Sequence, residues 1–125
     1  MNIPANLKYT KTDEWFNPAT RKAGLTDYAQ SQLSDIVFLE IVVAVGDALQ
    51  AGKSMASVES VKAAAESYAP VSAKVAAINE ELPDNPEILN SDPYGKGWMI
   101  QVEGGDASGL MDAAAYTKYC EERAH

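Results

Sequence analysis

The chain has 125 residues, 46% of them hydrophobic, and a formal net charge of −8, which suits one compact domain with its own core. The negative charge repels phosphate backbones and argues against nucleic acid as a partner. The single cysteine, Cys120, excludes an internal disulfide, and the only histidine, His125, is the last residue, so no imidazole is placed for a catalytic triad or a zinc site. We therefore expect a carrier or binding module, with no catalytic residue and no metal site, rather than an enzyme.

No stretch of the sequence is apolar and long enough to span a bilayer, so we expect no membrane contact. The N-terminal segment, residues 1–11, has neither an apolar signal region nor an Arg-rich presequence. These features predict a cytoplasmic bacterial protein, with a mature organellar form as the alternative. The excess of acidic residues ordinarily contributes solubility, and a surface that docks on basic patches of larger enzymes is the functional alternative.

The first predicted element is a short helix over residues 27–33, with Thr26 as its N-cap. Beyond it, short runs of β-branched and aromatic residues separated by turn-forming residues predict strands. The predicted strands are 35–39, 41–45, 57–61 and 70–75, with turns at 46–47 and 51–53. Several short strands at close spacing are typical of a β-sandwich or barrel.

Helical signals return in the second half of the chain. Residues 85–90 are interpreted as a turn or short helix, with Pro86 at a tolerated early position. A pair of glycines breaks the chain at 104–105, and the apolar spacing after it predicts an amphipathic C-terminal helix over about 108–122, capped near Ser108 or Asp112. We expect this helix to fold back on the strands of a single domain covering 1–125, with partner binding as the alternative.

Lys62 lies between two weakly similar segments, 45–49 and 71–75, each of which combines strand residues with a turn. Two similar halves around a central hairpin would place Lys62 at or near the hairpin tip. An exposed lysine is ordinarily only solvated. Here the small residues at 63–65 follow it and leave its amine open to an incoming enzyme, and Glu59 stands three residues before it.

Six segments of the chain, in order and in register, resemble the glycine cleavage H-protein family. The segments are 24–30, 33–38, 58–64, 68–72, 86–90 and 92–98, within a match that runs from about Leu7 to Trp98 and more loosely to the C-terminus. Biotin carriers are less similar, because they usually flank the lysine with methionine, whereas Val61 and Ala63 flank it here. Lipoyl domains of the 2-oxo acid dehydrogenases typically carry Asp before the lysine and lack the 92–98 segment.

The resemblance implies a mainly β fold, the lipoyl/biotinyl-type β-sandwich (barrel-sandwich hybrid), with short helices and a C-terminal helix. It implies that lipoic acid is amide-linked to Lys62 by a lipoyl ligase or transferase that recognises Glu59. The chain would then be a monomeric carrier of the glycine cleavage system. It would take an aminomethyl group from glycine decarboxylase (P protein), deliver it to the tetrahydrofolate-dependent aminomethyltransferase (T protein), and be reoxidised by dihydrolipoyl dehydrogenase (L protein).

The resemblance also implies a cleft that shelters the loaded arm, as closed sites generally exclude water. Glu14, in the segment before the first tryptophan, is the expected anchor for the amine of the arm. Leu33, Glu66 and Tyr68 fall at matching cleft positions. Their ordinary interpretations are core packing for Leu33, solvated charge for Glu66 and packing for Tyr68, and Tyr94 and Trp98 are expected in the core.

The sequence departs from the family pattern at several positions. Asp13 stands where the family usually has His, Ser34 stands where it has Gly, and the segment 16–23 is shorter. Ala73, eleven residues after Lys62, replaces a glycine, and if that position needs a positive φ the alanine is strained by roughly 1 kcal/mol or more. These departures leave two alternatives: an H-like lipoate-binding paralogue in another pathway such as sulfur oxidation, or an unmodified H-like interaction module.

Overall fold

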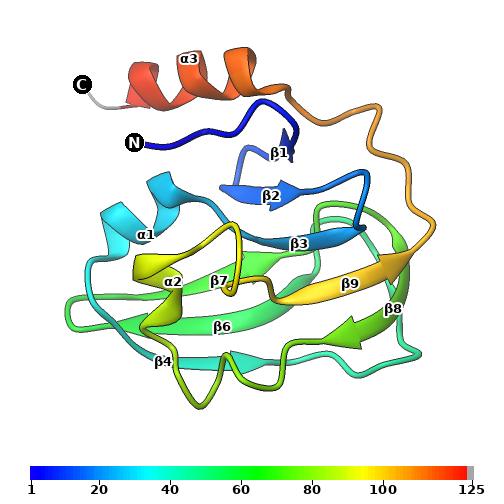
Figure 1. The fold of residues 1–125 in the computed structure, drawn as a ribbon, viewed down its shortest axis with the longest axis horizontal. Coiled ribbons are helices and arrows are strands. Elements are labelled where there is room, and N and C mark those ends of the chain that lie inside the picture. Colours follow the sequence, from blue (N-terminus) through cyan, green and yellow to red (C-terminus); the bar gives the residue numbers. More distant parts are fainter. Residues whose placement is uncertain (124–125) are drawn as a thin grey trace.

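The computed structural model describes residues 1–123, so His125 lies outside the described residues. Within these described residues, nine strands and three helices follow one another (Figure 1). Their bounds are β1 Lys8–Tyr9, β2 Glu14–Phe16, β3 Lys22–Leu25, α1 Asp27–Leu33, β4 Ile36–Ile41, β5 Ala48–Leu49, β6 Ser54–Ser60, β7 Ala64–Tyr68, β8 Ala73–Ile78, α2 Ile88–Ser91, β9 Ile100–Glu103 and α3 Ala113–Arg123.

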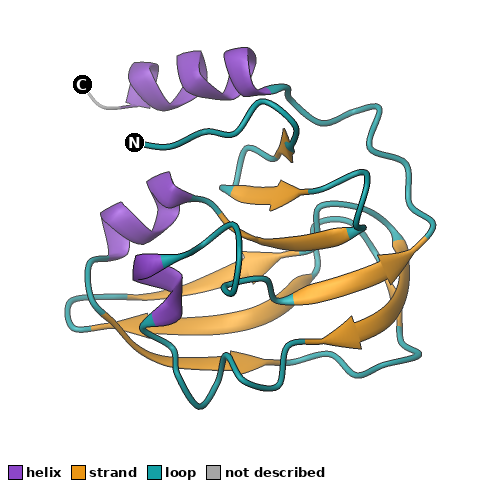
Figure 2. Cartoon of the chain, viewed as in Figure 1, coloured by secondary structure: helices purple, strands orange, loops and turns teal. Residues whose placement is uncertain are grey.

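The strands form two antiparallel sheets, one with the order β1-β2-β3-β9-β8-β5 and one with the order β4-β6-β7 (Figure 2). Side chains from both sheets meet in one hydrophobic cluster, which includes Phe16 and Val75 from the first sheet and Leu39 and Val58 from the second. Burying such a cluster supplies the main favourable free energy of folding. The β-sandwich with short helices and a C-terminal helix is thereby confirmed.

Helix α1 begins where the sequence predicts it. The Thr26 hydroxyl accepts the backbone N–H of Ala29 at 3.2 Å, which satisfies one free donor of the first turn. The helix ends at Ser34, which has a φ of 67° and donates its N–H to the Gln30 carbonyl. The Asn90 side chain then bonds both the Ser34 carbonyl and the Ile36 N–H, each at 2.9 Å, and this sets the start of β4.

The predicted strand over 41–45 is wrong, because β4 ends at Ile41 and the following residues form a loop. The loop is closed by local polar contacts: the Asp47 carboxylate accepts the Ala44 N–H at 2.9 Å, and Gly46, with a φ of 94°, donates its N–H to the Val75 carbonyl. These contacts outweigh the β-propensity of the valines, and Val45 is left 61% exposed.

Two other strand boundaries differ from the prediction. The strand expected over 70–75 begins only at Ala73, and the strand expected over 57–61 is the end of a longer β6. The two segments with similar sequence do not lie in separate halves, because β5 pairs directly with β8, with Ala48 opposite Lys74 and Leu49 opposite Ala73. Six strands were not predicted from the sequence: β1, β2, β3, β5, β7 and β9.

The C-terminal helix α3 folds back on the N-terminal strands, as expected, and packs above β1 in Figure 1. It begins at Ala113 rather than near Ser108, and Asp112 caps it by accepting the Ala115 N–H at 2.8 Å. Tyr116 stacks on Tyr9 with ring centroids 4.6 Å apart, and Cys120 is buried in the same cluster. Among the described residues, no helix is both long and apolar enough to cross a membrane.

Candidate functional site

Lys62 lies in the three-residue connection between β6 and β7, at the hairpin that projects from the left of Figure 1. The hairpin register pairs Glu59 with Ala64, so residues 61–63 form the tip. Lys62 is exposed, and within residues 1–123 no ion pair or side-chain hydrogen bond engages its amine. The expectation that this lysine stands at a hairpin tip is confirmed.

Ser60 shapes the tip. Its hydroxyl accepts the backbone N–H groups of Lys62 and Ala63 at 3.3 and 3.0 Å, while its own N–H donates to the Ala63 carbonyl at 2.8 Å. The Val61 N–H donates to the Asp35 carbonyl at 3.0 Å, which ties the tip to the start of β4. The backbone under Lys62 is therefore fixed, while its side chain is free.

Glu59 lies on β6 with its side chain exposed, opposite Phe38 of β4 and Ala64 of β7. A bulge at Val37 breaks the β4–β6 register and leaves both Val37 and Phe38 about half exposed. Together with Val61, these residues give the hairpin an apolar flank with a carboxylate beside it.

A cleft of about 180 Å³ lies where the β1–β2 turn, α1 and β7 meet. Its walls combine apolar side chains with two carboxylates, from Thr12, Asp13, Leu25, Ala29, Gln32, Leu33, Ala65 and Glu66. Of the predicted cleft residues, Leu33 and Glu66 therefore line it directly. Glu14 and Tyr68 lie beside it rather than on its surface.

A shallow groove lies beside the hairpin. It has a volume of about 260 Å³ and runs along β6 and β7, with Ala65 and Glu66 lining both the groove and the cleft. Glu66 is four residues beyond Lys62, which corresponds to about 13 Å of extended chain. A chain attached to Lys62 needs about this reach to arrive at Glu66, which lines the cleft.

Glu14, the expected anchor for the amine of the arm, is completely buried beneath the cleft. Its carboxylate accepts hydrogen bonds from the hydroxyls of Thr10, at 2.7 Å, and Thr12, and from the backbone N–H of Tyr68 at 3.0 Å. Burial raises the pKa of Glu14 to about 7, although the three hydrogen bonds oppose part of this rise. This carboxyl group therefore changes charge near neutral pH.

Ala73 has no backbone strain, contrary to the concern that a glycine conformation is needed there. It is the first residue of β8, pairs with Leu49, and is not among the described residues with a positive φ. Gly46, which the family pattern retains, does have a positive φ of 94°. The strained departure is instead Ser34, at a φ of 67° and a ψ of −150°.

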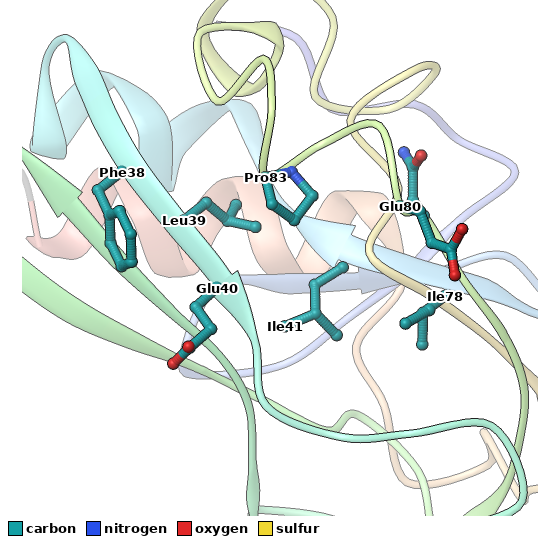
Figure 3. Close-up of a pocket in the computed structure, with 8 residues that line it drawn as sticks. Phe38, Leu39, Glu40, Ile41, Ile78, Glu80 and Pro83 are labelled. Carbon is teal, nitrogen blue, oxygen red and sulfur yellow. The ribbon is translucent and has the colours of Figure 1, made fainter.

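A further cavity, of about 340 Å³, is an open groove on another part of the surface (Figure 3). It lies between β4 and the segment 78–83, where Leu39 and Ile41 face Ile78 and Pro83, with Glu40 and Glu80 at its margins. Neither Lys62 nor a residue of the cleft lines it. Among the described residues, no group of three or more His, Cys, Asp or Glu side chains is arranged to hold a metal ion.

Several residues of the site were not predicted. Ser60, Thr10 and Thr12 act through hydroxyl contacts that have no sequence signature, and Asp13 was noted only as a departure from the family pattern. Tyr116 and Arg123 come from the far end of the chain and bond Asp13 at the cleft. The positive φ values at Asp13, Arg21 and Ser34 were not predicted either; each residue donates its N–H to a carbonyl three or four positions earlier, in a local turn or helix end. Tyr94 is half-buried, and its hydroxyl accepts the Asp27 N–H at 3.0 Å.

Comparison with known proteins adds independent information. The family model described as "Glycine cleavage H-protein" matches residues 7–123. Similar proteins named "Glycine cleavage system H protein" include one from Anaeromyxobacter sp. (strain K), 47% identical over 98% of this chain and 99% of the relative, and one from Halalkalibacterium halodurans, 49% identical over 96% and 94%. A crystal structure of a glycine cleavage system H protein from Mycobacterium marinum aligns with a TM-score of 0.83 and 31% identity, covering 98% of this chain and 100% of that one.

Proposed function

This chain belongs to the glycine cleavage H-protein family, and we propose that it carries a lipoyl group in amide linkage on Lys62. The protein is a carrier subunit of the glycine cleavage system and not itself a catalyst. The observation that best supports the attachment point is the exposed Lys62 on a hairpin tip, whose amine has no ion-pair partner among residues 1–123. A cleft with acidic lining includes Glu66, four residues further along the chain. Because the comparisons consistently give the glycine cleavage name, they favour this system over another lipoate pathway.

The residues around Lys62 fit a lipoyl group. Its amine is unhindered, since Ala63 and Ala64 are small and exposed, and the fixed backbone at Ser60 presents it outward. When bound, the lipoyl group supplies a disulfide that accepts a carbon fragment and is afterwards restored by oxidation. A tethered group of this kind stays at high effective concentration near any docked enzyme.

The cleft supplies the shelter that a loaded arm needs. Leu25 and Leu33 provide apolar walls that exclude water. Asp13 and Glu66 give the lining its acidic groups, although Arg123 already pairs with Asp13 and the Ser54 and Ser57 hydroxyls already bond Glu66. Glu14 supports the amine of the loaded arm from below. The Thr12 hydroxyl now occupies one of its oxygens, so direct contact with the amine requires that hydroxyl to turn aside.

Four kinds of enzyme are the proposed partners: glycine decarboxylase (P protein), aminomethyltransferase (T protein), dihydrolipoyl dehydrogenase (L protein) and a lipoyl ligase or transferase. The apolar flank formed by Val37, Phe38 and Val61 lies beside the tip, and Glu59 offers the ligase or transferase a charged contact. We also propose that the carrier works as a monomer in a bacterial cytoplasm, and its similar proteins from bacteria support this location.

Reconstitution with glycine decarboxylase and glycine labelled at its α-carbon, the carbon that remains after CO2 leaves, tests the proposal. The lipoylated chain is expected to acquire one labelled group, while the Lys62→Arg variant acquires none. Full lipoylation without any labelled adduct would exclude the glycine cleavage assignment and favour a paralogue in another pathway.

A further inference from the structure

Two residues of helix α3 bond Asp13, a carboxylate of the cleft proposed to hold the arm (the arm cleft). Asp13, at the β1–β2 turn, lines the cleft and accepts hydrogen bonds from the Tyr116 hydroxyl at 2.8 Å and from the Arg123 guanidinium at 3.1 and 2.5 Å. The side chains of Arg123 and Asp13 are only 30% and 17% exposed. A two-pronged contact of this kind is shielded enough to hold its carboxylate in one orientation.

A directed hydrogen-bond chain extends from this carboxylate to helix α1. A carboxylate only accepts hydrogen bonds, so the Tyr116 hydroxyl donates its proton in a hydrogen bond to Asp13. The Tyr116 oxygen must therefore accept the hydrogen bond from the Thr26 hydroxyl, 2.7 Å away. The same Thr26 oxygen caps α1 by accepting the Ala29 N–H. Thr26 and Tyr116 are completely buried, so water offers no substitute partner.

Arg123 makes a second connection between the same elements. Its guanidinium lies 4.5 Å from the ring centroid of Tyr28 on α1 and 4.1 Å from that of Tyr119 on α3. One side chain thus bridges the C-terminal helix, the first helix and the β1–β2 turn.

The elements held in this way are two walls of the cleft. Thr12 and Asp13 of the turn form one wall, and Ala29, Gln32 and Leu33 of α1 form the other, while α3 itself contributes no residue to the lining. Asp13 also has a φ of 74°, a sparsely populated conformation that persists only when its surroundings fix it. Its backbone carbonyl accepts the Thr26 N–H at 3.0 Å, so the two walls are already in contact there.

We infer that Tyr116 and Arg123 are positioning residues for the arm cleft, which act through Asp13 and Thr26 to fix the separation of its walls. The inference rests on the proposed function only in that the group held by the cleft is the lipoyl arm. The alternative is that the contacts of Tyr116 and Arg123 stabilise the whole fold without any particular effect on the cleft.

Hydrogen exchange on the unmodified full chain distinguishes the two. The reporters are the cleft-side amides of Tyr68, Thr26 and Ala29, and the reference is the Val75 amide, which donates to the Asp47 carbonyl far from α3. In Arg123→Ala and Tyr116→Phe we expect the reporters to exchange about threefold to tenfold faster relative to the reference. Arg123→Lys keeps the positive charge but loses the two parallel N–H donors of the guanidinium. Its reporter amides should exchange at rates between those of these variants and the parent.

Lys118→Ala is the matched control, because Lys118 is exposed on the same helix and makes none of these contacts. This variant should leave the ratio of the reporter exchange rates to the reference exchange rate unchanged. If Arg123→Ala and Tyr116→Phe accelerate all amides equally, or accelerate none, the positioning role is wrong.

A second measurement uses the lipoylated chain after loading with glycine and glycine decarboxylase. The release of ammonia without aminomethyltransferase is expected to be about threefold to tenfold faster in Arg123→Ala than in the parent or Lys118→Ala. Unchanged ammonia release would overturn the inference even if exchange responds. Failure of the parent chain to load would instead count against the proposed function, and the exchange experiment would still decide whether α3 fixes the cleft walls.

Discussion

The buried carboxylate of Glu14 accepts the backbone N–H of Tyr68 at 3.0 Å, although 54 positions separate the two residues in the sequence. Glu14 lies on β2 of one sheet and Tyr68 on β7 of the other, so this bond joins the two sheets next to the cleft. No lysine or arginine pairs with Glu14 among the described residues. Its charge is therefore balanced by hydrogen bonds alone.

Glu14 should make the stability of the protein depend on pH. Its folded-state pKa of about 7 exceeds the ordinary value of 4.5, so between these values the folded state binds more protons than the unfolded state. The free energy of unfolding should consequently fall as pH rises through this interval, by about 3 kcal/mol, and level off above it. In Glu14→Gln this contribution disappears. Urea denaturation at about pH 5 and about pH 8 measures the change.

Glu66→Gln is the control for this prediction, because Glu66 is an exposed carboxylate of the same cleft and should keep the parent's pH dependence. An identical pH dependence in Glu14→Gln and the parent would show that Glu14 titrates normally.

Ser34→Gly should stabilise the protein. Ser34 has a φ of 67° and a ψ of −150°, a combination that glycine adopts readily and that costs other residues free energy. The free energy gained by relieving this strain exceeds the cost of ordering the more flexible glycine backbone. We therefore expect the free energy of unfolding to rise by about 1 kcal/mol. Thermal unfolding checks the prediction, with Ser31→Gly, inside α1, as a control that should destabilise. A lower midpoint for Ser34→Gly would contradict the expected strain.

Ser60→Ala should slow attachment of the lipoyl group without unfolding the domain. The lost hydroxyl accepts the N–H groups of Lys62 and Ala63, so the tip that presents the lysine becomes less well defined. We expect kcat/KM for a lipoyl ligase to fall by about threefold to tenfold, which corresponds to a net hydrogen-bond contribution of about 1 kcal/mol. Ser72→Ala, on an exposed loop away from the tip, is the comparison, and equal rates for the two variants would refute this role of Ser60.

Ala73→Gly should not improve lipoylation through the backbone. Ala73 lies at the start of a strand in an ordinary conformation, so glycine relieves no strain and lowers the free energy of unfolding by about 0.5–1 kcal/mol. Denaturation and ligase kinetics measured on the same variant test both statements. A clear gain in ligase kcat/KM for Ala73→Gly would contradict the prediction and show that the side chain of Ala73 hinders the ligase.

The family, the sandwich and the exposed hairpin lysine could be predicted because they rest on local patterns. The Thr26 cap, the turn at Gly46 and the strand that leads to Lys62 each depend on residues close together in the sequence. The resemblance then placed these short segments in one register. The structure and the comparisons confirm both the fold and the family.

The burial of Glu14 and the role of Asp13 could not be predicted, because their partners lie far away in the chain. The carboxylate of Glu14 is enclosed by β7, and that of Asp13 is held by Arg123, 110 positions later. The strand expected over 41–45 failed for a different, local reason. The side-chain cap from Asp47 competed with β-propensity, and propensity alone does not reveal which prevails.

The identity of Lys62 as the attachment point is tested most directly by the intact mass of the chain expressed in a host that lipoylates its own carriers. We expect the parent to gain the mass of a single lipoyl group, which peptide mapping places on Lys62, while Lys62→Arg keeps the unmodified mass. An unmodified parent in such a host, or a lipoyl group on any other lysine, would contradict it.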